Sequence, residues 1–460
     1  MGTRINPEIF REYDIRGIAD SDLADPVGFI LGQTLGTYLG AHGCQSLTLG
    51  RDCRLSSERL MEQLSDGLQS TGMKVIALGV CPTPVLYFSL HHLNPDAGVM
   101  VTGSHNPPEY NGFKVALGSL TIYGEQIQEV RKLAEAGEFL VGAGERQEVS
   151  LSSHYRDYLA QALGRLSKPL RVVVDAGNGT GGVLGPQVYR DMGCEVIELY
   201  CTMDGNFPNH HPDPTVVKYL QDLIQMVRTE KADLGIAFDG DTDRIGVVDD
   251  QGNILWGDEL MILYSREILE RDPGATIVAE VKCSKNLYDE IEKRGGRGIM
   301  WKAGHSLIKA KMKQENALLG GEMSGHMFFA DRYFGYDDAI YAGARLLEHL
   351  SKSGRKLSEA LLDVPRTYST PEIRVDCPEA VKFKVVELAQ EYFSSHFSAV
   401  TVDGVRVIFD DGWGLVRASN TQPVLVLRFE AESQERLEEI RTLMEAKIQE
   451  FQDRVMENTD

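Results

Sequence analysis

Short apolar runs of strand length alternate with helix-like patterns through the first 368 residues, and this alternation limits the folds open to the chain. Residues 47–49 read as a strand that is followed by a helix pattern, with leucines at 60, 64 and 68. A second strand, residues 75–78, comes next. Strands that alternate with helices form βα units, so we expect mainly parallel sheets. We also expect Ser56 or Ser57 to cap the intervening helix.

The chain is long enough for several domains, because 460 residues exceed what one hydrophobic core normally serves. We expect three similar α/β domains with mainly parallel mixed sheets at residues 1–150, 151–253 and 254–368. Residues 142–147, rich in Gly and charge, suggest the first boundary. The segment from Pro365 to Pro371 suggests a hinge, and residues 369–460 read as a smaller C-terminal α+β domain with a helix from about 433 to 451.

Composition excludes several classes of partner. Asp and Glu outnumber Lys and Arg by 68 to 47, and the net charge of -21 argues against a nucleic-acid binder or an acidic-membrane binder. The seven cysteines are scattered without a Cys-x-x-Cys pair, as in a reduced compartment. The charged first residues do not form a signal peptide, and no segment has the length of a membrane span. We therefore expect a cytoplasmic protein.

A polar loop at residues 102–108 follows the buried strand predicted at 97–101. It places Ser104, His105 and Asn106 at the carboxyl end of a strand, where open α/β sheets bind ligands. Pro107 and Pro108 prevent a helix there. The alternative is a polar turn in which Ser and Asn satisfy their own backbone.

A second loop carries three carboxylates at alternate positions, Asp239, Asp241 and Asp243, between two apolar strands. Such charges are unfavourable unless a cation lies among them, and oxygen ligands alone indicate Mg²⁺ or Ca²⁺. An EF-hand is excluded because the sixth loop position is Arg244 and strands flank the loop. A solvated hairpin turn remains the alternative.

Two further loops are rich in polar side chains. Residues 320–326 place Glu322, Ser324 and His326 in one tight turn, which suits a polyol such as a sugar; the alternative is a capped turn with a buried His. In the last domain a donor-rich segment suited to phosphate, or else a polar hairpin loop, contains Arg417, Ser419, Asn420 and Thr421.

Two other loops have weaker signals. The Gly-rich turn at 175–182 matches a phosphate-cradling spacing, but we favour a tight turn that allows close packing. The adjacent His210 and His211 read as surface groups.

The four loops together resemble those of the α-D-phosphohexomutases. Their order and spacing fit, and the resemblance spans nearly the whole chain. It is carried by residues 102–107, 239–244, 321–326 and 417–421. Gly-Glu-Met-Ser-Gly-His with Arg-x-Ser-Asn-Thr is most similar to the bacterial phosphomannomutase/phosphoglucomutase branch. Phosphoglucosamine mutases have a related pattern, from which this chain departs at Met323, Asn420 and Gln422.

The resemblance implies four domains around a central cleft, with one loop from each. It implies reversible conversion of hexose 1-phosphate and hexose 6-phosphate, mannose or glucose, through a phosphoserine at Ser104 and a hexose 1,6-bisphosphate that serves as intermediate and activator. Mg²⁺ would be held by the phosphoryl oxygen on Ser104 and by Asp239, Asp241 and Asp243. Hexose phosphates would be its partners, and the protein would be a monomer or homodimer.

The resemblance also implies roles for single residues. Lys114, Arg244 and His305 would join Ser104 as catalytic residues, Lys114 as general acid or base after desolvation lowers its pKa. Glu322 and Ser324 would hold sugar hydroxyls. The phosphate that is not reacting would be held by Arg417, Ser419, Asn420 and Thr421. Further substrate contacts would come from Tyr13, Arg16, Lys282 and His326.

Three rival functions stay open. A phosphoglucosamine mutase would prefer glucosamine phosphates. A Mg²⁺-dependent sugar phosphatase would use an aspartate as nucleophile and would form no stable phosphoserine. A catalytically silent sugar-phosphate binding protein would have lost Ser104 or an aspartate, and this chain has lost neither.

Overall fold

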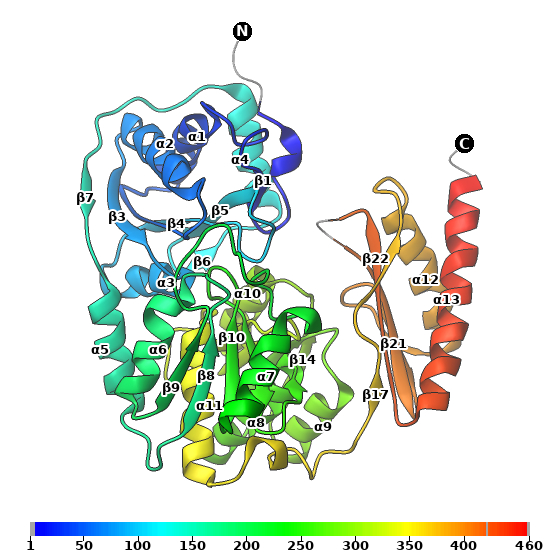
Figure 1. The fold of residues 1–460 in the computed structure, drawn as a ribbon. Helices are drawn as coiled ribbons and strands as arrows, with labels where there is room; N and C mark the ends of the chain where they lie inside the picture. Colours follow the sequence, from blue (N-terminus) through cyan, green and yellow to red (C-terminus); the bar gives the residue numbers. More distant parts are fainter. Residues whose placement is uncertain (1–4, 420–421, 458–460) are drawn as a thin grey trace.

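Four sheets follow one another along the chain in the computed structural model, which describes residues 5–419 and 422–457. In Figure 1 the first domain lies at the top, the second and third lie side by side below it, and the fourth stands apart at the right. The first three sheets are mixed and mainly parallel, and the fourth is antiparallel. This confirms the predicted fold class.

The first domain contains a seven-stranded sheet whose main path runs β1-β5-β4-β2-β3-β7, with β6 beside β5. Strands β2, β3, β4 and β7 are parallel to one another, and β5 runs against them. Strand β1 pairs antiparallel with β5 and so has the same direction as β4. Its elements are η1 (Pro7–Ile9), β1 (Ile15–Ile18), α1 (Val27–Ala41), β2 (Ser46–Arg51), α2 (Ser57–Ser70), β3 (Lys74–Val80), α3 (Thr83–His92), β4 (Ala97–Val101), β5 (Tyr110–Leu117), β6 (Leu120–Thr121), α4 (Glu125–Ala136) and β7 (Arg146–Glu148).

The second domain contains a five-stranded sheet in the order β12-β11-β10-β8-β9. Its parallel strands β9, β8 and β10 end near the first domain (Figure 1). Its elements are α5 (Ser152–Leu163), β8 (Arg171–Asp175), α6 (Gly181–Asp191), β9 (Glu195–Leu199), η2 (Val217–Leu220), α7 (Gln221–Glu230), β10 (Leu234–Phe238), β11 (Ile245–Asp249) and β12 (Ile254–Leu255).

The third domain contains a four-stranded sheet in the order β14-β13-β15-β16. Its elements are α8 (Gly257–Arg271), β13 (Thr276–Glu280), α9 (Lys285–Lys293), β14 (Arg297–Trp301), α10 (His305–Glu315), β15 (Leu319–Gly321), β16 (Met327–Phe329), α11 (Ala339–Ser353) and η3 (Leu357–Glu359).

The fourth domain packs two helices against an antiparallel sheet in the order β17-β22-β21-β20-β19, with β18 also beside β22. Its elements are β17 (Tyr368–Ser369), β18 (Ile373–Asp376), α12 (Lys382–His396), β19 (Ser398–Val400), β20 (Val405–Phe409), β21 (Gly412–Ala418), β22 (Val424–Ala431) and α13 (Gln434–Glu457).

Apolar packing joins the first three domains and leaves the fourth with its own core. One cluster of buried residues runs from α3 through α6 to α8 and α11. The fourth domain's core is a separate cluster, and a small group that includes Val281 and Trp413 connects it to the third domain. The fourth domain is therefore held to the others by much less buried apolar area.

Several local predictions differ from the structure. Ser56 lies at the N-cap of α2, but its side chain makes no capping hydrogen bond. The hydroxyls of Ser56 and Ser57 instead accept hydrogen bonds from the Asn111 amide, at 2.9 Å each. The last helix extends to Glu457, beyond the expected end at 451. Part of the expected boundary at 142–147 forms strand β7, and part of the expected hinge forms β17.

The Gly-rich turn at 175–182 packs closely, as predicted. A Cβ atom on Gly182 would lie 2.1 Å from the carbonyl oxygen of Cys201.

None of the helices in the described part of the chain combines the length and the apolar character needed to cross a lipid bilayer.

Candidate active site

The loops of the first and second domains meet at Ser104. This residue follows Gly103, three positions after the end of β4. Its Oγ lies 3.1 Å from Oδ2 of Asp239, which belongs to the loop between β10 and β11. The backbone of Ser104 is in the left-handed region, with φ at 49°, which non-glycine residues seldom adopt. The structure thus brings this serine and the aspartate loop together.

The three carboxylates between β10 and β11 form a buried group that fits a hard divalent cation. Asp239, Asp241 and Asp243 are fully buried, and one ligand oxygen from each lies within 4.8 Å of the others. Burial and the two neighbouring carboxylates raise the pKa of Asp239 well above its usual value. One oxygen each of Asp241 and Asp243 is buried without a hydrogen-bond partner. Mg²⁺ binds oxygen ligands, and these two unpaired carboxylate oxygens are able to supply them.

Lys114 on β5 partly neutralises this group. Its Nζ lies 2.7 Å from Asp241 Oδ2 and also pairs with Asp243. Burial lowers the pKa of Lys114, but the two carboxylates outweigh burial and hold the pKa well above the ordinary value. The expectation of a lowered pKa was therefore wrong, because the sequence did not show that two carboxylates face this amine.

The loop that carries Ser104 is held by Arg54, which the sequence analysis passed over. Arg54 Nη2 donates to the carbonyl oxygens of Ser104 at 2.7 Å and Asn106 at 2.6 Å. Arg54 Nη1 donates to the carbonyl oxygen of Tyr110 at 3.1 Å. A Cβ atom on Gly103 would lie 2.5 Å from Arg54 Nε, so this contact requires glycine. The sequence did contain a signal for this residue, namely the polar segment after β2. Because β2 pairs in parallel with β4, the segments that follow the two strands lie at the same edge of the sheet.

Asp52 also stabilises the loop that carries Ser104. Its Oδ2 accepts hydrogen bonds from Thr102 Oγ1 at 2.8 Å, the Gly103 amide at 3.1 Å and Arg54 Nε at 3.1 Å. Both Asp52 and Arg54 are about 1% exposed. A buried charge pair that satisfies so many backbone groups is suited to hold one loop conformation.

Arg16, Tyr13 and the adjacent histidines also lie around the loop. Arg16 on β1 donates to the Gly103 carbonyl and to Asn106 Oδ1, the latter at 2.8 Å. Tyr13 Oη donates to the carbonyl oxygen of Ala303 at 2.9 Å and so connects the first domain to the third. His211 hydrogen-bonds to the carbonyl of His105, and His210 lies 3.0 Å from Asp175. The interpretation of the two histidines as surface groups was wrong.

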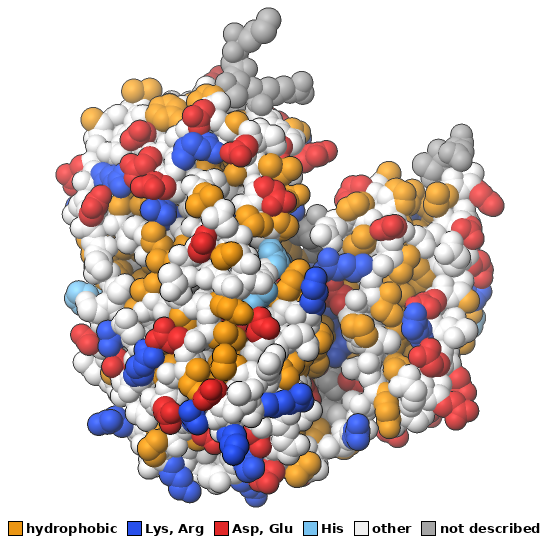
Figure 2. Space-filling model, in the orientation of Figure 1, with side chains coloured by type: hydrophobic (Ala, Val, Ile, Leu, Met, Phe, Trp, Pro, Cys, Tyr) orange, Lys and Arg blue, Asp and Glu red, His pale blue; other side chains and the backbone are white. Residues whose placement is uncertain are grey.

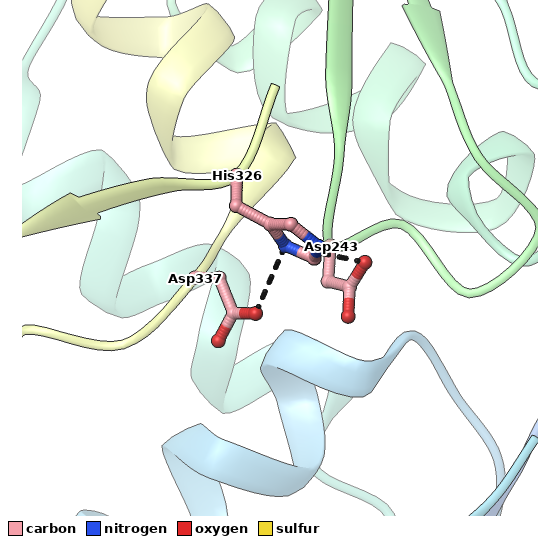
Figure 3. A group of neighbouring side chains, drawn as sticks. All are labelled: Asp243, His326 and Asp337. Atoms are coloured by element: carbon pink, nitrogen blue, oxygen red, sulfur yellow. Dashed lines mark ion pairs between the residues drawn. The ribbon is translucent and has the colours of Figure 1, made fainter. Parts of the chain in front are cut away.

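The third domain supplies a histidine cluster next to the carboxylates. Arg244 Nε donates to His326 Nε2 at 3.0 Å, and His326 Nδ1 lies 3.1 Å from Asp337 Oδ2 (Figure 3). The His305 ring lies 5.4 Å from the His326 ring, centre to centre. Burial and Lys309 hold the pKa of His305 well below its usual value, so its imidazole is neutral at physiological pH.

The residues expected to hold the sugar lie in the same turn as His326, between β15 and β16. Glu322 Oε1 accepts from the Gly304 amide at 2.7 Å, and Ser324 is half-buried two residues later. Lys282, after β13, lies 3.0 Å from Glu372 and 3.4 Å from Glu280. Burial lowers the pKa of Lys282, but these two carboxylates raise it above the ordinary value.

The donor-rich segment that contains Arg417 and Ser419 is called the phosphate cup below. It lies across a cleft from the first and third domains. Arg417 Nε donates to Asp403 Oδ2 at 2.9 Å, and Ser419 is buried beside it. Asn420 and Thr421 lie outside the described residues. A cavity of about 860 Å³ is lined by the first domain (Tyr123), the third (Lys302) and the fourth (Ala418). Figure 2 shows a hollow between the first and fourth domains, with Lys and Arg side chains along it.

Family comparisons match the chain along most of its length. The four models describe phosphoglucomutase/phosphomannomutase α/β/α domain I at residues 7–141, domain II at 153–252, domain III at 256–368 and the C-terminal domain at 372–447.

Individual proteins are similar over the same extent. The chain is 48% identical to a phosphomannomutase/phosphoglucomutase of Pseudomonas aeruginosa, covering 95% of this chain and 94% of that one. It is 45% identical to a phosphoglucomutase of Neisseria gonorrhoeae, with 97% of each covered. A crystal structure of a phosphoglucomutase/phosphomannomutase family protein from Burkholderia thailandensis superposes with a TM-score of 0.92 at 41% identity, covering 97% of this chain and 98% of that one.

Proposed function

This chain belongs to the phosphoglucomutase/phosphomannomutase family and interconverts hexose 1-phosphates and hexose 6-phosphates, and we propose that Ser104 carries the transferred phosphoryl group. The observation that supports this most directly is the contact between Ser104 Oγ and Asp239 at 3.1 Å, since Asp239 belongs to the carboxylate group proposed to bind a cation. A serine on a loop held by Arg54 and Asp52 is also well positioned for repeated transfer.

The proposed reaction uses two transfers. The phosphoryl group leaves Ser104 Oγ for the free hydroxyl at one end of the hexose phosphate, which loses its proton, and a hexose 1,6-bisphosphate forms. After the sugar turns around, the phosphoryl group at its other end is transferred to the Ser104 hydroxyl, which gives up its proton, and the oxygen left on the sugar takes up a proton. The number of phosphoryl groups on the enzyme is unchanged after one cycle.

The phosphoryl oxygen on Ser104 and the carboxylates of Asp239, Asp241 and Asp243 would hold Mg²⁺. When bound, the ion would neutralise charge on the transferred group. Arg244 lies in the same loop and would act on the same phosphoryl oxygens.

Proton transfer is assigned to two of the proposed catalytic residues. Lys114 is held as an ammonium by Asp241, so it is suited to donate a proton to the serine oxygen that leaves. The neutral imidazole of His305 is suited to accept the proton of the sugar hydroxyl.

Substrate recognition is divided between two domains. Glu322 and Ser324 would hold sugar hydroxyls. The distal phosphate would lie in the cup formed by Arg417, Ser419, Asn420 and Thr421. Tyr13, Arg16, Lys282 and His326 would line the path between the two. A promiscuous cup is needed because the bisphosphate must present either end to Ser104.

We infer that mannose and glucose phosphates are both substrates. The two sugars differ only at the 2-hydroxyl, and Glu322 and Ser324 are able to recognise hydroxyls elsewhere on the ring. Relatives named for both activities support this. A coupled assay with the 1-phosphates of mannose, glucose and glucosamine, each with hexose 1,6-bisphosphate as activator, should give comparable turnover of the first two and poor turnover of the third. A strong preference for glucosamine would contradict it.

The carrier role is tested by mass and by substitution. The intact protein should carry a phosphoryl adduct that maps to Ser104. The Ser104→Ala variant should lose nearly all mutase turnover but should unfold at about the same temperature as the wild type. Near-normal turnover of Ser104→Ala would overturn the proposal. An adduct on an aspartate would instead favour a phosphatase.

The remaining expectations stay proposals. They are a monomer or homodimer located in the cytoplasm, binding hexose phosphates and neither nucleic acid nor membrane. The domain limits 1–150, 151–253, 254–368 and 369–460 also remain a prediction.

A further inference from the structure

A second group of buried acidic and histidine side chains lies beside the carboxylates of the proposed cation site. It consists of Asp243, His326 and Asp337, which point toward one another in Figure 3. Asp337 lies just before helix α11 and is fully buried. Asp337 has no role in the proposed mechanism.

The contacts of His326 show where its ring proton lies. Arg244 Nε always carries a hydrogen and donates it to His326 Nε2 at 3.0 Å, so Nε2 must present its lone pair. A neutral ring that accepts at Nε2 carries its proton on Nδ1. His326 Nδ1 lies 3.1 Å from Asp337 Oδ2 and 3.6 Å from Asp243 Oδ1.

The partner of that proton is the carboxylate of Asp337. Neither His326 Nδ1 nor Asp337 Oδ2 has a hydrogen-bond partner elsewhere among the described residues. A small rotation of the ring or the carboxylate therefore aligns the N–H with the oxygen. Lys309 Nζ lies 3.0 Å from the other oxygen of Asp337 and stabilises the ionised carboxylate, which accepts but does not donate.

The same contacts argue against a metal ion in this second group. A cation bound by His326 Nδ1 would force the ring proton onto Nε2, which would then face the N–H of Arg244 at 3.0 Å. The positive charge of Lys309 already compensates Asp337. The group is better described as a chain of side chains that ends at Arg244.

The chain from Asp337 to Arg244 has a geometric consequence at the reaction centre. With Nε engaged by His326, the two terminal nitrogens of Arg244 form the fork that remains for a phosphate. The backbone amide of Arg244 donates to Asp239 Oδ1 at 3.1 Å, so the residue is also tied to the proposed cation site. The orientation of this fork therefore depends on which nitrogen of the His326 ring carries the proton.

We propose that Asp337 is a positioning residue, which fixes the Nδ1–H form of His326 and thereby aims the guanidinium of Arg244 at the phosphoryl group on Ser104. This inference rests on the proposed function of Ser104. Asp337 itself lies behind His326 and does not touch the substrate. The arrangement resembles the carboxylate that holds a catalytic histidine in one tautomer in serine proteases.

The ring proton is measured directly by long-range ¹H–¹⁵N correlation on wild-type protein with ¹⁵N-labelled histidine. His326→Gln identifies the resonances of His326. We expect the unprotonated nitrogen of His326 to be Nε2 in the wild type. A proton on Nε2 would overturn the proposal, whether or not any variant folds and whether or not Ser104 proves to be the carrier.

Asp337→Asn tests the consequence for catalysis. Asn has one acceptor oxygen, for which His326 and Lys309 compete, and its amide is able to donate to Nδ1. We expect the ring proton to shift toward Nε2 and kcat to fall about 100-fold, as for a misplaced catalytic group, with little change in KM. Wild-type kcat in Asp337→Asn would overturn the proposal.

Asp338→Asn is the matched control. Asp338 is the next residue, is also buried, and accepts hydrogen bonds from Tyr155 and Tyr333 instead of a histidine. We expect it to change the unfolding temperature but to leave the His326 tautomer and kcat near wild type. An equal loss of kcat in both variants would show that Asp337 acts only through the stability of the fold.

Discussion

The guanidinium of Arg54 donates a hydrogen bond of 2.7 Å to the backbone carbonyl oxygen of Ser104. The two residues are 50 positions apart and follow neighbouring parallel strands, β2 and β4. The contact means that the geometry of the proposed phosphoryl carrier depends on a buried side chain from the loop after another strand.

Arg54→Lys should therefore impair both stability and catalysis. A lysine amine cannot reproduce the planar fork, so several buried carbonyl groups and Asp52 lose partners, and we expect unfolding to become easier by about 3 kcal/mol. We also expect kcat to fall, because the loop loses its single conformation. Thermal unfolding and steady-state kinetics measure the two effects. Arg51→Lys, at a more exposed position that pairs loosely with Glu58, should change neither by much; similar losses in both variants would contradict the role given to Arg54.

Asp241→Ala should raise the Mg²⁺ concentration needed for activity and lower the maximal rate. It would remove one of the three carboxylates proposed to bind the ion, and it leaves Lys114 with Asp243 alone. Activity titrated with Mg²⁺ measures both effects, and Asp222→Ala on the exposed face of α7 is the control. Chelator-treated wild type should be inactive until Mg²⁺ is added, and full activity without added metal would show that the ion is not catalytic.

Arg417→Ala should weaken the binding of hexose 1-phosphate and hexose 6-phosphate alike. The buried guanidinium is held by Asp403, so a bidentate contact with phosphate would contribute about 2 to 4 kcal/mol. The variant should also depend more on added hexose 1,6-bisphosphate, because the intermediate escapes more readily. Calorimetric titration with both monophosphates tests this, with Arg441→Ala on α13 as control. Weaker binding of only one monophosphate would show that the cup does not serve both orientations.

Asp338→Asn should change how stability depends on pH. Burial raises the pKa of Asp338 to about 6, against the hydrogen bonds from the Tyr341 amide, Tyr333 and Tyr155. The folded protein therefore binds this proton more tightly than the unfolded chain does. The resulting stabilisation is complete below about pH 4 and is lost as the pH rises through 6.

The asparagine variant lacks this titration. Its free energy of unfolding relative to wild type should therefore increase by about 1 kcal/mol between pH 5 and pH 7.5. Denaturant unfolding of both proteins at the two pH values provides the measurement. A difference that stays constant with pH would refute the raised pKa.

Much of the fold was readable from the sequence, since its signals are local. The alternation of apolar strands with amphipathic helices identified three α/β domains, and the change in strand pattern after Pro365 identified the C-terminal domain. The carboxylates at 239, 241 and 243 were recognisable because three buried charges between apolar strands need a counter-charge. Element ends were less certain: α13 runs six residues past its expected end, because packing stabilises the last turns.

Contacts between distant residues were decided only by the tertiary structure. Lys114 was expected to have a lowered pKa, and the structure reverses the sign because Asp241 and Asp243, more than a hundred positions away, face its amine. Arg54, His211 and Asp337 carry no local pattern that separates them from solvated side chains. Sequence alone thus determined which loops carry the chemistry, since a loop's residue types are written in the chain. Which side chains support those loops depends on how four separate sheets pack, and that packing decides burial, charge state and the position of a proton.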